Sequence, residues 1–198
     1  MFAFTDSPRW VTVRVPKQVR KDANTYAKLH AQDYQANYVG RQNDYANILL
    51  DCVCGWAFSK WCNDEHLWHD PNYLDDNDVD CVLDLKDVGL TPVVIVPKYL
   101  LDQGGIDTPG LRVSHWRLSV EKPNYYIAAS FSGHSVTFYG GAVKYDILGS
   151  SHIFEARPLI YDVPETELNL SMGWFAKYAV KTNEQQETFY NIFDEEAQ

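Results

Sequence analysis

The sequence predicts a single α+β domain in which a central mixed β-sheet is flanked by helices. Alternating apolar runs recur along the chain, for example at 10–15, 81–87 and 125–131, which is the period of half-buried strands. Two other stretches, 17–38 and 43–62, space their apolar residues by three and four positions, as helices do. The 198 residues, 45% of them hydrophobic, supply one core of ordinary size and exclude two large domains.

The first half of the chain is expected to contribute one strand and two helices. The strand at 10–15 stops at Pro16, and the helix that follows ends near Gly40, which accepts the left-handed conformation of a helix cap. The second helix begins after Asn43, a favourable N-cap, and its wide apolar face predicts that it is largely buried. Residues 62–80 are acidic and without period, which predicts a loop.

The second half is expected to be rich in strands. A β-hairpin is predicted from 81–86 and 93–96, with Gly89 and Pro92 in its turn. Further alternating runs predict a meander, and the tail from about 182 to 198 is expected to be peripheral. These runs lie at 111–120, 125–131 and 135–139, with a last strand at 157–161.

Charge and hydropathy limit the possible partners. With 17 Lys and Arg against 27 Asp and Glu, the formal charge of -10 excludes a globally basic nucleic-acid-binding surface but allows a local basic groove. Arg14, Arg20, Lys21 and Lys28 would form such a basic strip, although a solvated helix face explains them equally well. No apolar run reaches the roughly 20 residues of a membrane span, and no signal peptide is evident, so we expect a soluble cytoplasmic protein without a membrane partner.

The cysteines are expected to be free thiols without zinc. Helical spacing sends three of them to different faces, and the pair at 52 and 54 lacks zinc-knuckle spacing, although His66 and His69 follow closely. The four residues are Cys52, Cys54, Cys62 and Cys81.

Acids and lysines in and around the predicted hairpin are the main candidates for chemistry. Asp84 and Lys86 lie two apart on one strand, so alternation places both on one face. Such a pair, joined by further acids, can hold Mg²⁺ against a phosphodiester, whereas an ordinary surface salt bridge is the alternative. No Gly-rich phosphate loop, nucleophile elbow or HExxH motif is present. The whole group is Asp75, Asp76, Asp78, Asp80, Asp84, Lys86 and Lys98.

The order of these elements resembles the PD-(D/E)XK nuclease superfamily, in particular its small phage and environmental members. A strand, a buried helix with an acid, a hairpin with an acid and a lysine, and paired strands follow one another in the same order. The matching blocks are NILLDCVCGWAFSKW, NDVDCVL, NYYIAASF, VTFYGGA and YDVP. The resemblance implies a restriction-endonuclease-like fold and a Mg²⁺-dependent nuclease, with Mn²⁺ as a substitute ion, that hydrolyses phosphodiester bonds in DNA.

On this resemblance, Asp51 takes the place of the helix acid, Asp80 or Asp78 that of the hairpin acid, and Lys98 that of the catalytic lysine. One position departs from the family pattern. The acid expected two residues before Lys98 is Val96, so a metal site would lose one negative ligand.

The alignment on Asp80 and Lys98 is the first of two possible registers of the family motif on this sequence. The second register uses Asp84 and Lys86 as the acid-x-Lys element, so that no acid is missing. The sequence leaves the two registers open. The implied roles are Asp80 and Asp84 as metal ligands, Lys86 or Lys98 in support of the attacking water, and Asp51 as an outer acid. The alternative function is an inactive nuclease-fold protein that binds a protein partner or mimics nucleic-acid charge. Val96 and the acidic net charge favour that alternative.

Overall fold

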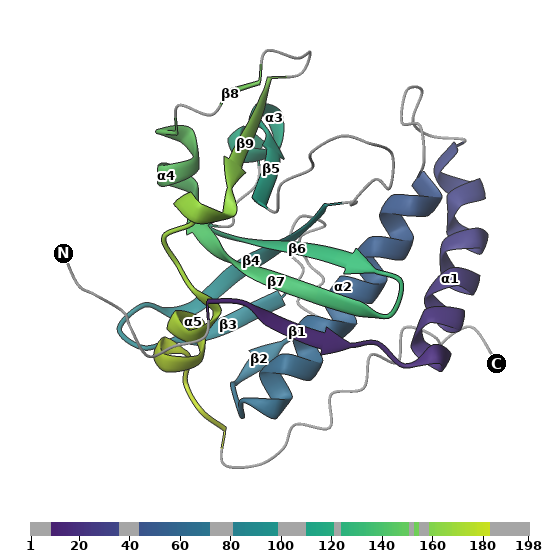
Figure 1. The fold of residues 1–198 in the computed structure, drawn as a ribbon, viewed down its shortest axis with the longest axis horizontal. Coiled ribbons are helices and arrows are strands. Elements are labelled where there is room, and N and C mark those ends of the chain that lie inside the picture. The colour runs from purple at the N-terminus through teal and green to yellow at the C-terminus, as the bar shows by residue number, and fades with distance from the viewer. Residues whose placement is uncertain are drawn as a thin grey trace.

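A mixed six-stranded β-sheet is the centre of the fold in the computed structural model (Figure 1). The structure describes residues 9–35, 44–71, 81–98, 110–120, 124–150, 153–154 and 159–182. The first half contains β1 (Val11–Arg14), α1 (Lys17–Gln35), α2 (Asp44–Asp64), β2 (His69–Asp70), β3 (Cys81–Leu85) and β4 (Gly89–Lys98). The second half contains β5 (Gly110–Ser114), α3 (His115–Val120), β6 (Tyr125–Ser132), β7 (Ser135–Val143), α4 (Lys144–Leu148), β8 (Ile153–Phe154), β9 (Ile160–Pro164), the 3-10 turn η1 (Glu165–Glu167) and α5 (Met172–Tyr178).

The large sheet has the strand order β1-β7-β6-β4-β3-β2. Its neighbours are antiparallel except for the central pair, β4 and β6, which run parallel with Val93 opposite Tyr125 and Lys98 opposite Ser130. The predicted α+β class and the mixed sheet are therefore confirmed. In the part of the chain that is described, no helix is both long enough and apolar enough to cross a bilayer.

Two apolar cores lie on opposite faces of this sheet. On one face α2 packs against the central strands, and α1 packs against α2. Val93 and Ile95 of β4 enter this first core with Phe58 of α2. On the other face Val94 and Val96 enter a second core, because side chains alternate along a strand.

The second core is covered by a small antiparallel sheet in the order β5-β9-β8, together with α3 and α4, which lie above the large sheet in Figure 1. Leu111 and Val113 of β5, Leu118 of α3 and Ile147 of α4 are buried there. The sequence predicts a sheet flanked by helices, and the structure has helices on one face and mainly strands on the other.

Among the described residues, each proline of β4 is opposite a residue of only one neighbouring strand. Pro92 is opposite Val82 of β3, and pairing with β6 begins one residue later. Pro97 is opposite Ala129 of β6, beyond the last residue that pairs with β3. A proline has no N–H to donate and is tolerated where one edge of the strand is unpaired.

The hairpin prediction is correct in its strands and wrong in its turn. The turn occupies residues 86–88, and β4 already begins at Gly89, so Pro92 lies inside a strand. The predicted loop at 62–80 is also partly wrong, because α2 continues to Asp64 and β2 pairs with β3. The rest of that loop, 72–80, lies outside the described residues, as does the end of the first helix near Gly40.

The predicted meander is the largest error. The run 111–120 is not one strand, since β5 ends at Ser114 and α3 follows it. β5 belongs to the small sheet and pairs with β9, whereas β6 and β7 form a hairpin in the large sheet. The sequence also gives no prediction of α4 and α5.

Candidate functional site

The residues that the resemblance assigns to the hairpin are only partly within the described structure. Asp80 lies outside it, as do Asp75, Asp76 and Asp78. Lys98 is the last residue of β4, and its side chain is not among those described. The register built on Asp80 and Lys98 therefore stays a prediction.

The second register does not keep its two groups on one strand. Asp84 is a half-buried residue of β3, between Leu83 and Leu85, which belong to the first core, so its side chain points to the opposite face. Lys86 lies in the turn after β3, where its Nζ atom donates a hydrogen bond to the carbonyl oxygen of Lys177, at 2.9 Å. The prediction that Lys86 belongs to the strand that carries Asp84 is wrong, because β3 ends at Leu85.

Asp51 is exposed on α2, next to Leu50 and Val53, which are buried. Because α2 packs on the face of the sheet that Asp84 points away from, the sheet lies between these two carboxylates. Within the described ranges, no group of three or more His, Cys, Asp or Glu residues could hold a metal ion.

Val96 is the residue for which the sequence resemblance, aligned on Lys98, leads us to expect an acid. Its side chain is 5% exposed and belongs to the second core. It lies opposite Ala128 on the parallel strand, and β5 covers this face of β4 and β6. A carboxylate at this position would be buried among apolar side chains without access to water or substrate.

A basic pocket lies where β1, the start of α1 and the β6–β7 turn meet. It has a volume of about 390 Å³ and is lined by the side chains of Arg14, Lys17, Arg20 and His134, with Val15 and Pro16. Among the residues that the structure describes, no Asp or Glu lines it. The backbone N–H of Val15 donates to the carbonyl oxygen of His134 at 2.8 Å, which fixes the turn beside the strand.

Arg20 ties the helix to this turn and still has donor capacity. Its Nη1 atom donates to the carbonyl oxygen of Gly133 at 2.9 Å. Its Nε atom is buried and has no hydrogen-bond partner in the described structure. A buried donor without an acceptor costs free energy.

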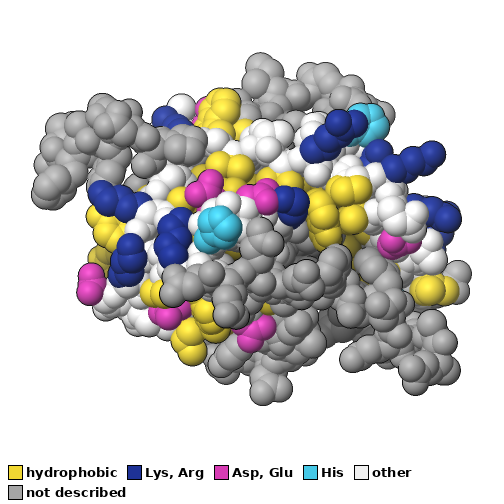
Figure 2. Space-filling model, turned by 90° about the horizontal axis from the view of Figure 1, so that it is seen from below, with side chains coloured by type: hydrophobic (Ala, Val, Ile, Leu, Met, Phe, Trp, Pro, Cys, Tyr) yellow, Lys and Arg dark blue, Asp and Glu magenta, His cyan; other side chains and the backbone are white. Residues whose placement is uncertain are grey.

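The local charge differs in sign from that of the whole chain. Between Arg9 and Gln35 the sequence has six Lys or Arg and two Asp, although the whole chain has a formal charge of -10. In Figure 2, Lys and Arg side chains lie on the right-hand part of the surface, toward α1, and also on its left-hand part. Positive side chains beside the free N–H groups of a helix start favour an anion, and phosphate is the commonest such group.

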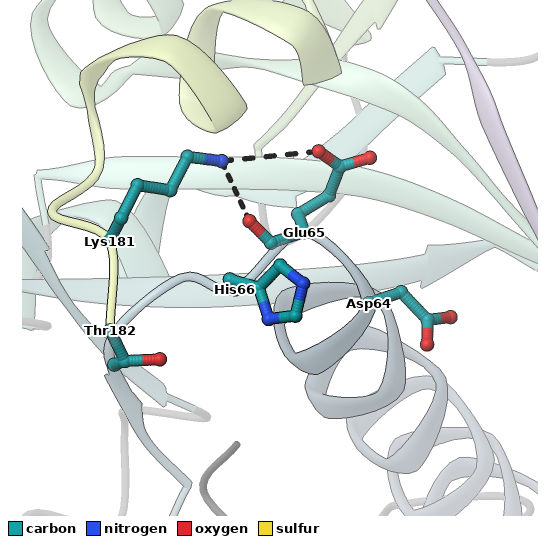
Figure 3. Close-up of a pocket in the computed structure, with 5 residues that line it drawn as sticks. All are labelled: Asp64, Glu65, His66, Lys181 and Thr182. Atoms are coloured by element: carbon teal, nitrogen blue, oxygen red, sulfur yellow. Dashed lines mark hydrogen bonds and ion pairs between the residues drawn. The ribbon is translucent and has the colours of Figure 1, made fainter. Parts of the chain in front are cut away.

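Another pocket, at the C-terminal end of α2, is lined by residues of both charges (Figure 3). His66 has φ 55° and ends the helix where glycine is usual, with its N–H donating to the carbonyl oxygen of Asn63. Lys181 donates to the carbonyl oxygen of Glu65 at 2.7 Å, and the N–H of Thr182 donates to the carbonyl oxygen of His66 at 2.8 Å.

These contacts bind the segment after α5 to the end of α2. Asp64 is already paired with Lys60, and the carboxylate of Glu65 lies 4.0 Å from the Nζ atom of Lys181. The charged groups of this pocket thus interact with other groups of the same chain, which favours a structural role for the pocket.

The sequence indicates part of the basic pocket. Arg14 and Arg20 belong to the predicted basic strip, whereas Lys17 and His134 are not included in it. Residues 14 and 134 are 120 positions apart, and only the pairing of β1 with β7 brings them together. No local pattern carries that information.

Comparison with known proteins adds no further evidence about this pocket, because no family model, curated protein or solved structure matches the chain.

Proposed function

We propose that the chain binds the phosphate groups of a nucleic acid and does not cleave them. The observation that carries the proposal is the pocket of Arg14, Lys17, Arg20 and His134, which combines several donors and has no carboxylate among the described residues that line it. Arginine and lysine at hydrogen-bonding distance of a phosphodiester supply most of the affinity in nucleic-acid binding.

We infer the lack of cleavage from Val96, an apolar residue at a position where a nuclease would need an acid. In the PD-(D/E)XK register that the sequence resembles, the missing acid is replaced by an apolar side chain inside the second core. A metal site with one ligand fewer, on a face covered by β5, is a poor catalyst of phosphodiester hydrolysis. The proposal is thus of a restriction-endonuclease-like domain that keeps a phosphate-binding surface.

The competing proposal is a Mg²⁺-dependent nuclease acting on DNA. It would use Asp80 and Asp84 as metal ligands, Lys98 or Lys86 beside the attacking water, and Asp51 as an outer acid. Its support is the β3–β4 hairpin next to a buried helix, in the order that the resemblance requires.

Binding is tested by fluorescence anisotropy with labelled DNA and RNA oligonucleotides over a range of salt concentrations. The Arg14→Ala/Lys17→Ala variant is expected to lower the affinity at least tenfold and to flatten the dependence on salt, because about two phosphate contacts are lost. Lys60→Ala, which removes an exposed lysine paired with Asp64, is the matched control and should bind as the parent does. Equal affinities for all three proteins would refute the proposal.

Cleavage is tested with the same oligonucleotides in Mg²⁺ and in Mn²⁺. We expect intact substrate, and no rise in the melting temperature on addition of either ion. Cleavage by the parent protein that Asp80→Asn abolishes would instead establish the nuclease. Binding to a protein alone, with no oligonucleotide bound at low salt, would favour the alternative of a protein partner.

A further inference from the structure

An aromatic ring, a hydroxyl and a guanidinium follow one another along one face of β1 and the residue before it. Trp10, Thr12 and Arg14 alternate with Val11, Val13 and Val15, and the valines face the first core. The three outward side chains therefore share the opposite face of the sheet. We call them the β1 strip.

β7 extends this strip sideways. Trp10 contacts Tyr139, the Oγ1 atoms of Thr12 and Thr137 lie 3.0 Å apart, and Arg14 is opposite Ser135. β5 packs on β4 and β6, which lie farther from the edge strand β1 within the large sheet.

The indole of Trp10 is held in place and remains accessible. Its side chain is 48% exposed, although a large apolar ring gains free energy by burial. The ring lies edge-on to Tyr139, with the centroids 5.6 Å apart and the planes at 80°. The hydroxyl of Tyr139 is in turn 2.7 Å from the buried Oγ of Ser130, which fixes the supporting ring. A fixed, accessible indole is a platform on which a flat ring can stack.

The spacing of the strip fits a nucleotide chain. Four residues of a strand separate Trp10 from Arg14 by about 13 Å. This is the length of about four nucleotides at 3.4 Å each, and of fewer in an extended strand. Arg14 also lines the basic pocket, so the strip leads from the indole directly to the phosphate-binding groups.

We infer that the β1 strip binds single-stranded nucleic acid, with one base stacked on Trp10 and the following phosphates directed toward Arg14 and the basic pocket. In a duplex the base faces are covered by their neighbours, so Trp10 would have no ring to stack on. The inference rests on the proposed function and adds the strandedness of the ligand and the residue that contacts its bases.

The test measures the binding of oligo-dT, oligo-rU and a DNA duplex of equal length in the anisotropy assay. The affinity for inorganic polyphosphate is measured by its competition with a labelled oligonucleotide. Trp10→Ala should weaken single-strand binding about 5- to 150-fold, which corresponds to the loss of one stacked base. Its affinity for polyphosphate should change less than twofold, because phosphate contacts remain. Trp10→Phe should restore most of the single-strand affinity. Tyr145→Ala, which removes an aromatic ring that is 83% exposed on α4, is the control and should have no effect.

Two results would overturn this inference while leaving the proposed function standing. One is single-strand binding by Trp10→Ala equal to that of the parent, with the Arg14→Ala/Lys17→Ala variant still defective. The other is tighter binding of the duplex than of either single strand by the parent protein. If instead the Arg14→Ala/Lys17→Ala variant binds every ligand normally, the proposed function itself fails.

Discussion

The Nδ1 atom of His69 lies 3.2 Å from the carbonyl oxygen of Leu67, in a side chain that is only 1% exposed. The other ring nitrogen, Nε2, is buried without a hydrogen-bond partner in the described structure. A proton added to Nε2 would place a charge in an apolar environment. Burial is accordingly the main reason that the pKa of His69 is lowered from 6.5, and it outweighs the opposing effects of Leu67 and Asp70.

This histidine makes stability depend on pH. The unfolded chain takes up the His69 proton near pH 6.5, while the folded protein takes it up only at lower pH, so the unfolded state binds more protons in between. The free energy of unfolding should therefore fall as the pH drops below 6.5. In urea titrations at pH 7.5 and 5.5, His69→Asn should reduce this fall. His66→Gln, at an exposed histidine, should retain it.

Gly140 should tolerate no side chain. It has φ +109°, and a Cβ atom there would lie 2.4 Å from the carbonyl oxygen of Leu170. That backbone cannot move away easily, because Gly141 and Leu170 exchange hydrogen bonds of 2.7 and 3.0 Å. Gly140→Ala is expected to lower the free energy of unfolding by more than about 3 kcal/mol, through strain and steric overlap together.

The control for that substitution is Gly89→Ala. Gly89 also has a positive φ, +82°, but nothing lies within 4 Å of an added Cβ. Its replacement should cost only the backbone strain, about 1–2 kcal/mol. Similar losses in the two variants, measured by urea unfolding, would contradict the close packing of residues 168–171 on β7.

Introducing at position 96 the acid that the sequence resemblance leads us to expect should not produce a nuclease. Val96→Glu would place a carboxylate in the second core, and we expect a loss of at least about 3 kcal/mol in the free energy of unfolding. Val88→Glu, at an exposed valine of the same hairpin, should change it by less than about 0.5 kcal/mol. A stable Val96→Glu protein that cleaves DNA with Mg²⁺ would show that this face is open to substrate.

The native cysteines should react slowly with a thiol reagent such as DTNB at pH 8. Cys54, Cys62 and Cys81 are buried, and none of the four cysteines forms a disulfide. Burial, followed by the charge of Asp51, raises the pKa of Cys52 to about 12, so almost no thiolate is present. Four thiols should react after denaturation, and a native mass spectrum should show neither zinc nor the two-proton loss of a disulfide. Rapid labelling of the native protein would contradict this packing.

Local patterns account for the parts of the fold that could be predicted. The hairpin of β6 and β7 follows from alternation on both sides of a short polar turn, and α2 follows from its helical spacing. α3 was missed, although the alternation of 111–120 changes phase between Val113 and Trp116, which breaks a single strand face. α5 is too short for a clear period, and its one signal is Ser171, whose side chain caps the helix by accepting from the N–H of Trp174 at 3.0 Å.

The candidate site was less predictable because it depends on long-range pairing. The basic strip could be recognised from Arg14 and Arg20, but the turn that completes the pocket is supplied by a hairpin far along the chain. At position 96, in contrast, the residue could be identified from the sequence, but its surroundings could not be predicted. The sequence identifies Val96 as a departure from the family pattern, whereas only the packing of β5 explains why an apolar residue is suited there.

The parallel pair of β4 and β6 contributes alternate residues to both cores, and this arrangement has a consequence for cooperativity. Neither apolar layer can separate without disturbing strands that the other layer also needs, so the domain is expected to unfold in one step. Amide hydrogens of Ile95 and Ile127 should then exchange with solvent only through global unfolding. Those of the two-residue edge strand β2 should exchange through smaller openings, and deuterium uptake measured residue by residue would separate the two classes.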